Sequence, residues 1–361
     1  MSGAATTVSE TPTVDAAQAS IQATLNRYGL ANREGAEPIG ALVDPNIPAL
    51  RRILGDQQRF LDDPQLPTGT TYTVREIAYN TPSLALVTIA RPDGLTTQRW
   101  FRSNGSGAWL FSELYEEELG EPQTEIIGPL TVVTYPWLED RRADLSARFE
   151  QALDTIEATL GPLPDEPVRI TLKPAAHLPP TLDSFTTGLY TPGKPDQLVL
   201  SLPGSAVYPY IDPALDPYEH LGRVLTHELS HWATHRGHID RNKMPLWLFE
   251  GIAEYVAQPR PSPEVIATTA WLPMEAPDQR DLLHMDRLPP GDRRTAYVQS
   301  HLLVLYLVER AGLDSIWALA ESYSTTPGIG AARLDSAVQQ VYEVSLDELL
   351  RDWSAWLTDQ E

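Results

Sequence analysis

Apolar residues recur along the chain in two different patterns, and the change between them divides it into two regions. Near the N-terminus, apolar positions at helical spacing predict helices over residues 14–28 and 47–61. Four runs rich in β-branched and aromatic residues follow, at 72–79, 83–89, 96–102 and 108–114. The turn sequences Pro-Asp-Gly at 92–94 and Asn-Gly at 104–105 separate the last three runs, so we expect an antiparallel meander after two helices.

The second region combines a few predicted strands with long helical stretches. Strands are predicted at 130–134, 167–172 and 197–202, and a helix at 140–160. The sequence therefore predicts an α+β fold, in which N-terminal helices and an antiparallel meander precede a small sheet and a mostly helical C-terminal half.

The boundary between the two regions is expected in the acidic stretch 113–125, which contains Gly120 and Pro122 and is the predicted linker. We therefore expect one domain over 14–118 and a second over 126–361, behind a disordered Ser/Thr/Ala-rich tether at 1–13. Such tethers often follow a removed signal or lipid anchor. We expect an extracytoplasmic protein on this basis, although a cytoplasmic location stays open.

The segment Thr226-His227-Glu228-Leu229-Ser230-His231 contains the HExxH pattern. On a helix, His227 and His231 lie one turn apart on the same face, where two neutral imidazoles can hold one Zn²⁺. Glu228 follows the first histidine and is the predicted general base. A structural alternative for these residues is the polar face of an ordinary helix.

A second apolar segment, 247–255, places Glu250 after His231 with eighteen residues between them. Its neighbours are mostly apolar, so the carboxylate is expected to be buried, and an unpaired buried carboxylate is costly. Binding of a metal removes that cost, and Glu250 would complete a His₂Glu set with one coordination position open. The alternative for Glu250 is a carboxylate on a solvent-facing helix.

These residues resemble the gluzincin zinc metallopeptidases, in particular the bacterial peptidase-MA-like domains related to the aminopeptidase and thermolysin-like cores. The resemblance covers the chain from about residue 168 to the C-terminus, and Trp-Leu-Phe-Glu-Gly-Ile-Ala-Glu-Tyr at 247–255 is similar to the third-ligand helix of that group. It implies that His227, His231 and Glu250 are zinc ligands and that Glu228 is the general base.

The same resemblance implies roles for two further residues. Glu254 lies one turn after Glu250, where thermolysin-like relatives place an acid that orients a ligand histidine, here expected to be His227. Tyr297 lies at the start of the apolar, Leu-rich helix predicted over 295–307, and the tyrosine that begins the corresponding helix of aminopeptidase-like gluzincins stabilises the tetrahedral oxyanion. His301, one turn later, is a second candidate donor. Surface or core positions are the structural alternatives for all three.

One departure limits the resemblance, and one rival zinc pattern does not fit the chain. The upstream Gly-x-Met-Glu-Asn strand that binds a free amine in aminopeptidases is missing, so an endopeptidase is expected rather than an aminopeptidase. The rival metzincin pattern HExxHxxGxxH needs glycine at 234 and histidine at 237, where this chain has Thr234 and Gly237. His235 and His238 are expected to end the helix instead.

Composition excludes several other classes. A formal net charge of −22 argues against nucleic-acid binding, because phosphate contacts need a basic surface. The absence of cysteine excludes disulfides and cysteine nucleophiles. No run of 18 apolar residues exists, so no transmembrane segment is expected. The Pro-rich stretch 259–294 is predicted to form a cleft wall or lid.

The preferred hypothesis is zinc-dependent hydrolysis of a peptide or protein substrate. Two alternatives stay open: an exported binding protein with a non-catalytic zinc domain, and hydrolysis of a non-peptide substrate at the same zinc. The order of elements in 14–118 weakly resembles the nuclear transport factor 2-like α+β cone, which would bind a ligand or position the second domain.

Overall fold

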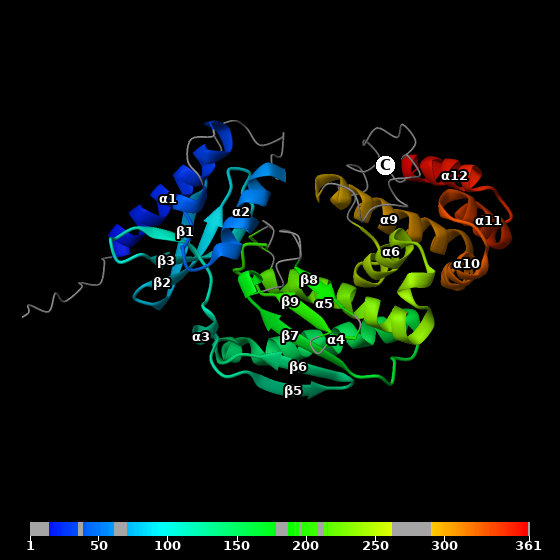
Figure 1. Cartoon of the computed structure of the whole chain (residues 1–361), viewed down its shortest axis with the longest axis horizontal. Coiled ribbons are helices and arrows are strands. Elements are labelled where there is room, and N and C mark those ends of the chain that lie inside the picture. Colours follow the sequence, from blue (N-terminus) through cyan, green and yellow to red (C-terminus); the bar gives the residue numbers. More distant parts are fainter. Residues whose placement is uncertain are drawn as a thin grey trace, which may run out of the picture. The chain divides into compact units, whose positions relative to one another are not determined.

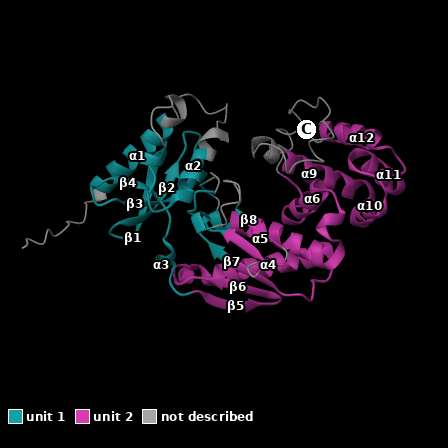
Figure 2. Cartoon of the chain, viewed as in Figure 1, with its two compact units in different colours: residues 1–121, 172–187, 201–219 teal, residues 122–171, 188–200, 220–361 magenta. Residues whose placement is uncertain are grey.

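The computed structural model describes residues 14–34, 39–60, 71–177, 187–191, 193–194, 197–207, 213–214, 216–261 and 290–359. The predicted tether at 1–13 and most of the Pro-rich stretch, 262–289, lie outside these residues. The chain forms two compact units, shown in Figure 2. Unit 1 comprises 1–121, 172–187 and 201–219, and unit 2 comprises 122–171, 188–200 and 220–361. Helices accompany one antiparallel and one mixed sheet, which confirms the predicted α+β class.

Unit 1 contains the two predicted helices and the predicted meander (Figure 1). The helices are α1 (Val14–Glu34) and α2 (Pro48–Phe60). The strands, in the order β1-β2-β3-β4, are β1 (Thr73–Thr81), β2 (Leu84–Ala90), β3 (Thr96–Ser103) and β4 (Trp109–Ser112). Every neighbouring pair is antiparallel, as the turn residues predict.

Helix α1 satisfies backbone groups at both edges of this sheet. The Gln22 side chain donates to the Tyr72 carbonyl at 2.7 Å and accepts from the Val74 amide at 3.1 Å. At the other edge, the Thr24 hydroxyl donates to the carbonyl of Trp109 at 2.6 Å. Because Tyr79 of β1 and Trp109 of β4 are also in ring contact at 5.9 Å, the sheet is strongly curled. The contacts of α1 therefore occupy part of the backbone at each edge.

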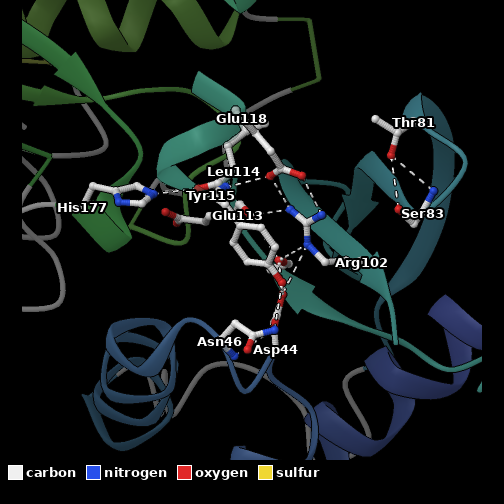
Figure 3. A network of polar contacts seen from close by, with 11 residues as sticks. Asp44, Asn46, Thr81, Ser83, Arg102, Glu113, Leu114, Tyr115, Glu118 and His177 are labelled. Atoms are coloured by element: carbon white, nitrogen blue, oxygen red, sulfur yellow. Dashed lines mark hydrogen bonds and ion pairs between the residues drawn. The ribbon is translucent and has the colours of Figure 1, made fainter. Parts of the chain in front are cut away.

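The start of the predicted linker is instead part of the core of unit 1, so this prediction was wrong at Glu113. The Glu113 side chain is fully buried and accepts hydrogen bonds from the amides of Ala206 (2.9 Å) and Ala176 (2.7 Å). The ring of His177 contacts the carbonyl of Leu114 at 2.6 Å. Figure 3 shows Glu113, Leu114 and His177, which lie together after the end of β4. Glu113 therefore attaches two distant segments, around 176 and 206, to the first sheet.

A second group of polar contacts, also drawn in Figure 3, surrounds Arg102 of β3. Arg102 makes two hydrogen bonds to the Glu118 carboxylate, at 2.6 and 2.8 Å, and lies 3.3 Å from Asp44. The buried Asp44 accepts from the hydroxyls of Tyr115 (2.7 Å) and Ser112 (2.9 Å). Short helix α3 (Glu116–Leu119) carries Glu118, so the acidic stretch is ordered by specific ion pairs.

Unit 2 begins with a mixed five-stranded sheet in the order β5-β6-β7-β9-β8. Its strands are β5 (Gln123–Ile127), β6 (Leu130–Thr134), β7 (Val168–Lys173), β8 (Gly188–Tyr190) and β9 (Leu198–Ser201). The three predicted strands correspond to β6, β7 and β9. Strand β5 was not predicted, because it begins inside the acidic stretch. The predicted helix at 140–160 is α4 (Arg142–Leu160), preceded by the 3-10 turn Pro136–Arg141.

The rest of unit 2 is helical, as expected. The helices are α5 (Pro217–Ala233), α6 (Leu246–Ala257), α9 (Pro290–Ala311), α10 (Leu313–Thr325), α11 (Gly330–Tyr342) and α12 (Leu346–Thr358). Helix α12 begins with a capping box, in which Ser345 and Glu348 satisfy each other's backbone amides. Among the described residues, no helix is both long and apolar enough to cross a bilayer.

Candidate metal centre

Helix α5 carries the HExxH residues and buries its apolar face. Leu221, Leu225 and Leu229 are each at most 2% exposed and recur at four-residue intervals, which fixes the rotation of the helix. His227 and His231 consequently share the opposite side of the helix, with their ring centroids 4.7 Å apart and their planes at 88°. The buried leucines of α5 thus fix the side of the helix on which the two histidines lie.

Helix α6 brings Glu250 to the two histidines. Glu250 Oε2 lies 3.1 Å from His231 Nε2 and 3.3 Å from His227 Nε2, and the two Nε2 atoms are 3.1 Å apart. Three ligands around a tetrahedral Zn²⁺, with bonds of about 2.0–2.1 Å, are separated by roughly 3.3 Å. The triangle of donor atoms therefore fits a tetrahedral ion with one position left open. Within the described residues, these three side chains are the one group of this kind.

The near-miss histidines have other partners. His238 Nε2 contacts the carbonyl of Leu160 at 2.8 Å, and its ring stacks on Trp317 at 4.2 Å. His235 Nδ1 accepts from the amide of Arg241 at 3.2 Å. Both residues belong to the π-helical turn Thr234–His238 that follows α5. Neither residue is therefore available as a third histidine ligand, which removes the geometric basis of the metzincin alternative.

Burial and mutual proximity change the acidity of the cluster. Burial alone would raise the pKa of Glu250, but the neighbouring His231 and the hydrogen bond from His227 outweigh it, so the pKa of Glu250 lies well below its usual range. Burial lowers the pKa of His227, yet hydrogen bonds to Glu250 and Glu254 raise it well above 6.5. The carboxylates on both sides of His227 thus favour the positively charged form of its ring when no metal is bound. A divalent cation would take the place of that positive charge.

Glu254, predicted to orient a ligand histidine, lies against His227. Its Oε1 atom is 3.4 Å from His227 Nδ1, the ring nitrogen that faces away from Glu250. Its other oxygen, Oε2, accepts from Arg223 at 2.8 Å. His231 is held differently, because its ring stacks on Phe249 with centroids 4.2 Å apart and planes at 16°. Its buried Nδ1 has no hydrogen-bond partner in the described part of the chain.

Glu228 is buried between α5 and strand β8. A Cβ on Gly188 would lie 2.7 Å from Glu228 Cγ, so the carboxylate side chain runs directly over the glycine backbone. Burial raises the pKa of Glu228, although the two histidines and a backbone hydrogen bond from Tyr190 act in the opposite direction. A carboxylate with a raised pKa is a better proton acceptor near neutral pH. The charges of His227, His231 and Glu250 all act on Glu228, so its carboxylate lies close to the donor triangle.

Helix α9 contributes the candidate donors. The helix begins at Pro290, several residues before Tyr297. The prediction that Tyr297 lies at the start of this helix was therefore wrong. The centroid of the partly buried Tyr297 ring is 6.4 Å from that of His227. His301 is 3% exposed, and burial lowers its pKa to about 4, so it is neutral at physiological pH. The structure thus brings Tyr297 close to His227 and buries His301.

Two residues of the candidate site, Arg223 and Gly188, were not predicted from the sequence. Arg223 lies one turn before His227, and this spacing alone could have indicated a position on the same face of α5. Gly188 lies within a strand, where glycine often marks a close backbone approach. Neither signal identifies the partner, which in each case comes from a segment distant in the sequence.

Comparisons with known proteins do not assign the chain: no protein-family model matches it, and no curated protein does either.

Proposed function

We propose that the chain is a zinc-dependent peptide hydrolase with His227, His231 and Glu250 as the metal ligands. The observation that carries the proposal is the triangle of donor atoms with sides of 3.1, 3.1 and 3.3 Å. Two imidazoles and one carboxylate are a donor set typical of catalytic zinc, and the chain has no thiolate to offer. A divalent ion held there would polarise a carbonyl group and make a water molecule a stronger nucleophile.

The remaining steps fall to residues of the chain. Glu228 accepts the proton of the attacking water and returns it to the leaving amine nitrogen. Tyr297 donates a hydrogen bond to the carbonyl oxygen as negative charge develops on it. Glu254 holds the His227 ring by accepting from Nδ1, which leaves Nε2 free for the metal.

Strand β8 supports a peptide as the substrate. It forms one edge of the five-stranded sheet and runs past Glu228, so an extended peptide could add to this edge beside the site. The strand consists of Gly188, Leu189 and Tyr190 and has no acid to bind a free amine. An endopeptidase is therefore favoured over an aminopeptidase.

The test combines metal analysis with peptide profiling of the full chain. We expect about one zinc per chain, cleavage of a peptide library by the parent, and a loss of at least about 100-fold in Glu228→Gln with the metal retained. Glu219→Gln changes an exposed glutamate on the same helix and is the matched control. A Glu228→Gln protein that cleaved like the parent would exclude the general-base role. A metal-loaded parent without any cleavage would favour the binding-protein alternative.

A further inference from the structure

Arg223 and Glu254 repeat, one helical turn away, the pairing of His227 with Glu250. On α5, Arg223 precedes His227 by four residues, and on α6, Glu254 follows Glu250 by four residues. His227 Nε2 lies 3.3 Å from Glu250 Oε2 at the proposed metal site. One turn further along both helices, Arg223 Nη2 lies 2.8 Å from Glu254 Oε2. A third contact links the two pairs, because His227 Nδ1 lies 3.4 Å from Glu254 Oε1. The four side chains thus form one connected set between two helices.

We propose that Arg223 is a positioning residue, which holds Glu254 so that this carboxylate keeps His227 oriented for metal binding. The proposal rests on the metal site proposed above. Each oxygen of the Glu254 carboxylate has one partner, because Oε2 accepts from Arg223 and Oε1 faces His227 Nδ1. With Arg223 in place, rotation of the carboxylate would break the short 2.8 Å contact. Without Arg223, the carboxylate loses the contact that directs Oε1 to the histidine.

The exposure of the two partners separates a positioning role from a structural one. The Arg223 side chain is 45% exposed, whereas that of Glu254 is 18% exposed. An ion pair with so exposed an arginine adds little to folding stability, because water and salt screen it. Orientation of a ligand histidine, in contrast, affects metal affinity strongly. The contact therefore matters more for the metal than for the fold.

The experiment measures Zn²⁺ affinity of the full chain by competition with a chromophoric chelator, together with the melting temperature in the metal-free form. We expect Arg223→Gln to weaken Zn²⁺ binding about tenfold with little change in melting temperature, and Arg223→Lys to restore part of the affinity. Glu254→Ala should weaken binding by about 10–100-fold. The double variant should be no weaker than Glu254→Ala alone, because Arg223 acts through Glu254.

Arg310→Gln is the matched control, since it breaks an ion pair of 2.9 Å between α9 and α12, with partner exposures of 28% and 51%. It should bind Zn²⁺ like the parent. Unchanged affinity in Arg223→Gln, or additive losses in the double variant, would overturn the positioning role. If Arg223→Gln changes only KM for peptides, the arginine binds substrate instead and the inference is likewise wrong. A parent chain that binds no Zn²⁺ overturns the proposed metal site itself, which distinguishes the two failures.

Discussion

Gly251 of α6 lies against the backbone of Ser300 in α9 so closely that a Cβ on the glycine would be 2.5 Å from the Ser300 carbonyl oxygen. It would also lie 2.7 Å from Cγ2 of Val304. Only a residue without a side chain allows this approach of the two helices. Because Gly251 follows Glu250 directly, the helix contact also sets the position of a proposed metal ligand.

Gly251→Ala should therefore damage both the fold and the metal site. The added methyl group would force α6 and α9 apart, at a cost of about 1–3 kcal/mol in the free energy of unfolding. The displacement of Glu250 should weaken Zn²⁺ binding. Urea denaturation and metal titration measure the two effects. Gly222→Ala in α5 is the control, because its new Cβ would meet Arg148 only at an ordinary 3.7 Å, and alanine favours the helix. Equal behaviour of the two variants would contradict the close-approach argument.

Gly188→Ala should impair catalysis while leaving metal binding intact. Its Cβ would lie 2.7 Å from Glu228 Cγ and 2.9 Å from side-chain atoms of Leu200 and Val224. The proposed base, Glu228, would be displaced, whereas the three proposed ligands come from α5 and α6 and should keep their places. We expect kcat to fall at least about tenfold with an unchanged zinc content. Parent-like turnover in a correctly folded Gly188→Ala protein would show that Glu228 does not need this strand.

Glu113→Gln should destabilise unit 1, because an amide cannot accept from the amides of both Ala176 and Ala206. The loss of one buried hydrogen bond, with a donor left unsatisfied, costs about 1–3 kcal/mol. The variant Glu117→Gln, at an exposed position of α3, is the control and should be neutral. Chemical denaturation at pH 7 measures the difference.

The stabilities of the parent and of Glu113→Gln should also depend differently on pH. Burial raises the pKa of Glu113 above 4.5, although the backbone amides of Ala176 and Ala206 and the charges of His177 and Arg99 oppose the shift. The folded state therefore holds this proton more tightly than the unfolded state does. The contribution to stability is full below pH 4.5 and is lost as pH rises through the folded-state pKa. The advantage of the parent over Glu113→Gln should shrink as pH rises; a gap that widens would be the wrong sign.

His301 should make the metal-free protein sensitive to acid. Burial lowers its pKa from 6.5 to about 4, so the folded state binds this proton less readily than the unfolded state. The stability is full above pH 6.5 and falls as pH decreases toward 4, by up to about 3 kcal/mol from this group. His301→Phe should flatten this slope in denaturation measured with a chelator at several pH values. His220, whose pKa is also lowered to about 4, should keep part of this dependence of stability on pH in both proteins. An unchanged slope would show that His301 is already protonated or solvated.

Local patterns predicted much of the fold and the central part of the candidate site. The turn sequences at 92–94 and 104–105 predicted the meander, because glycine and its partners have strong local backbone preferences. The spacing of His227 and His231 predicted a shared helix face. By contrast, the acidic composition around Glu113 suggested a linker, since nothing local reveals that its carboxylate meets an amide 93 residues away.

The sequence by itself determined the types and order of the proposed ligands and the helix that presents two of them, because these depend on residues within one or two turns. Only the tertiary structure decided that Glu250 closes the triangle, that Arg223 reaches Glu254 across 31 residues, and that Gly188 and Gly251 lie where a methyl group would collide. The physical reason is range: helix periodicity is set by neighbours along the chain, whereas distances between side chains of different helices are set by how the leucine-rich faces and glycine contacts bring those helices together.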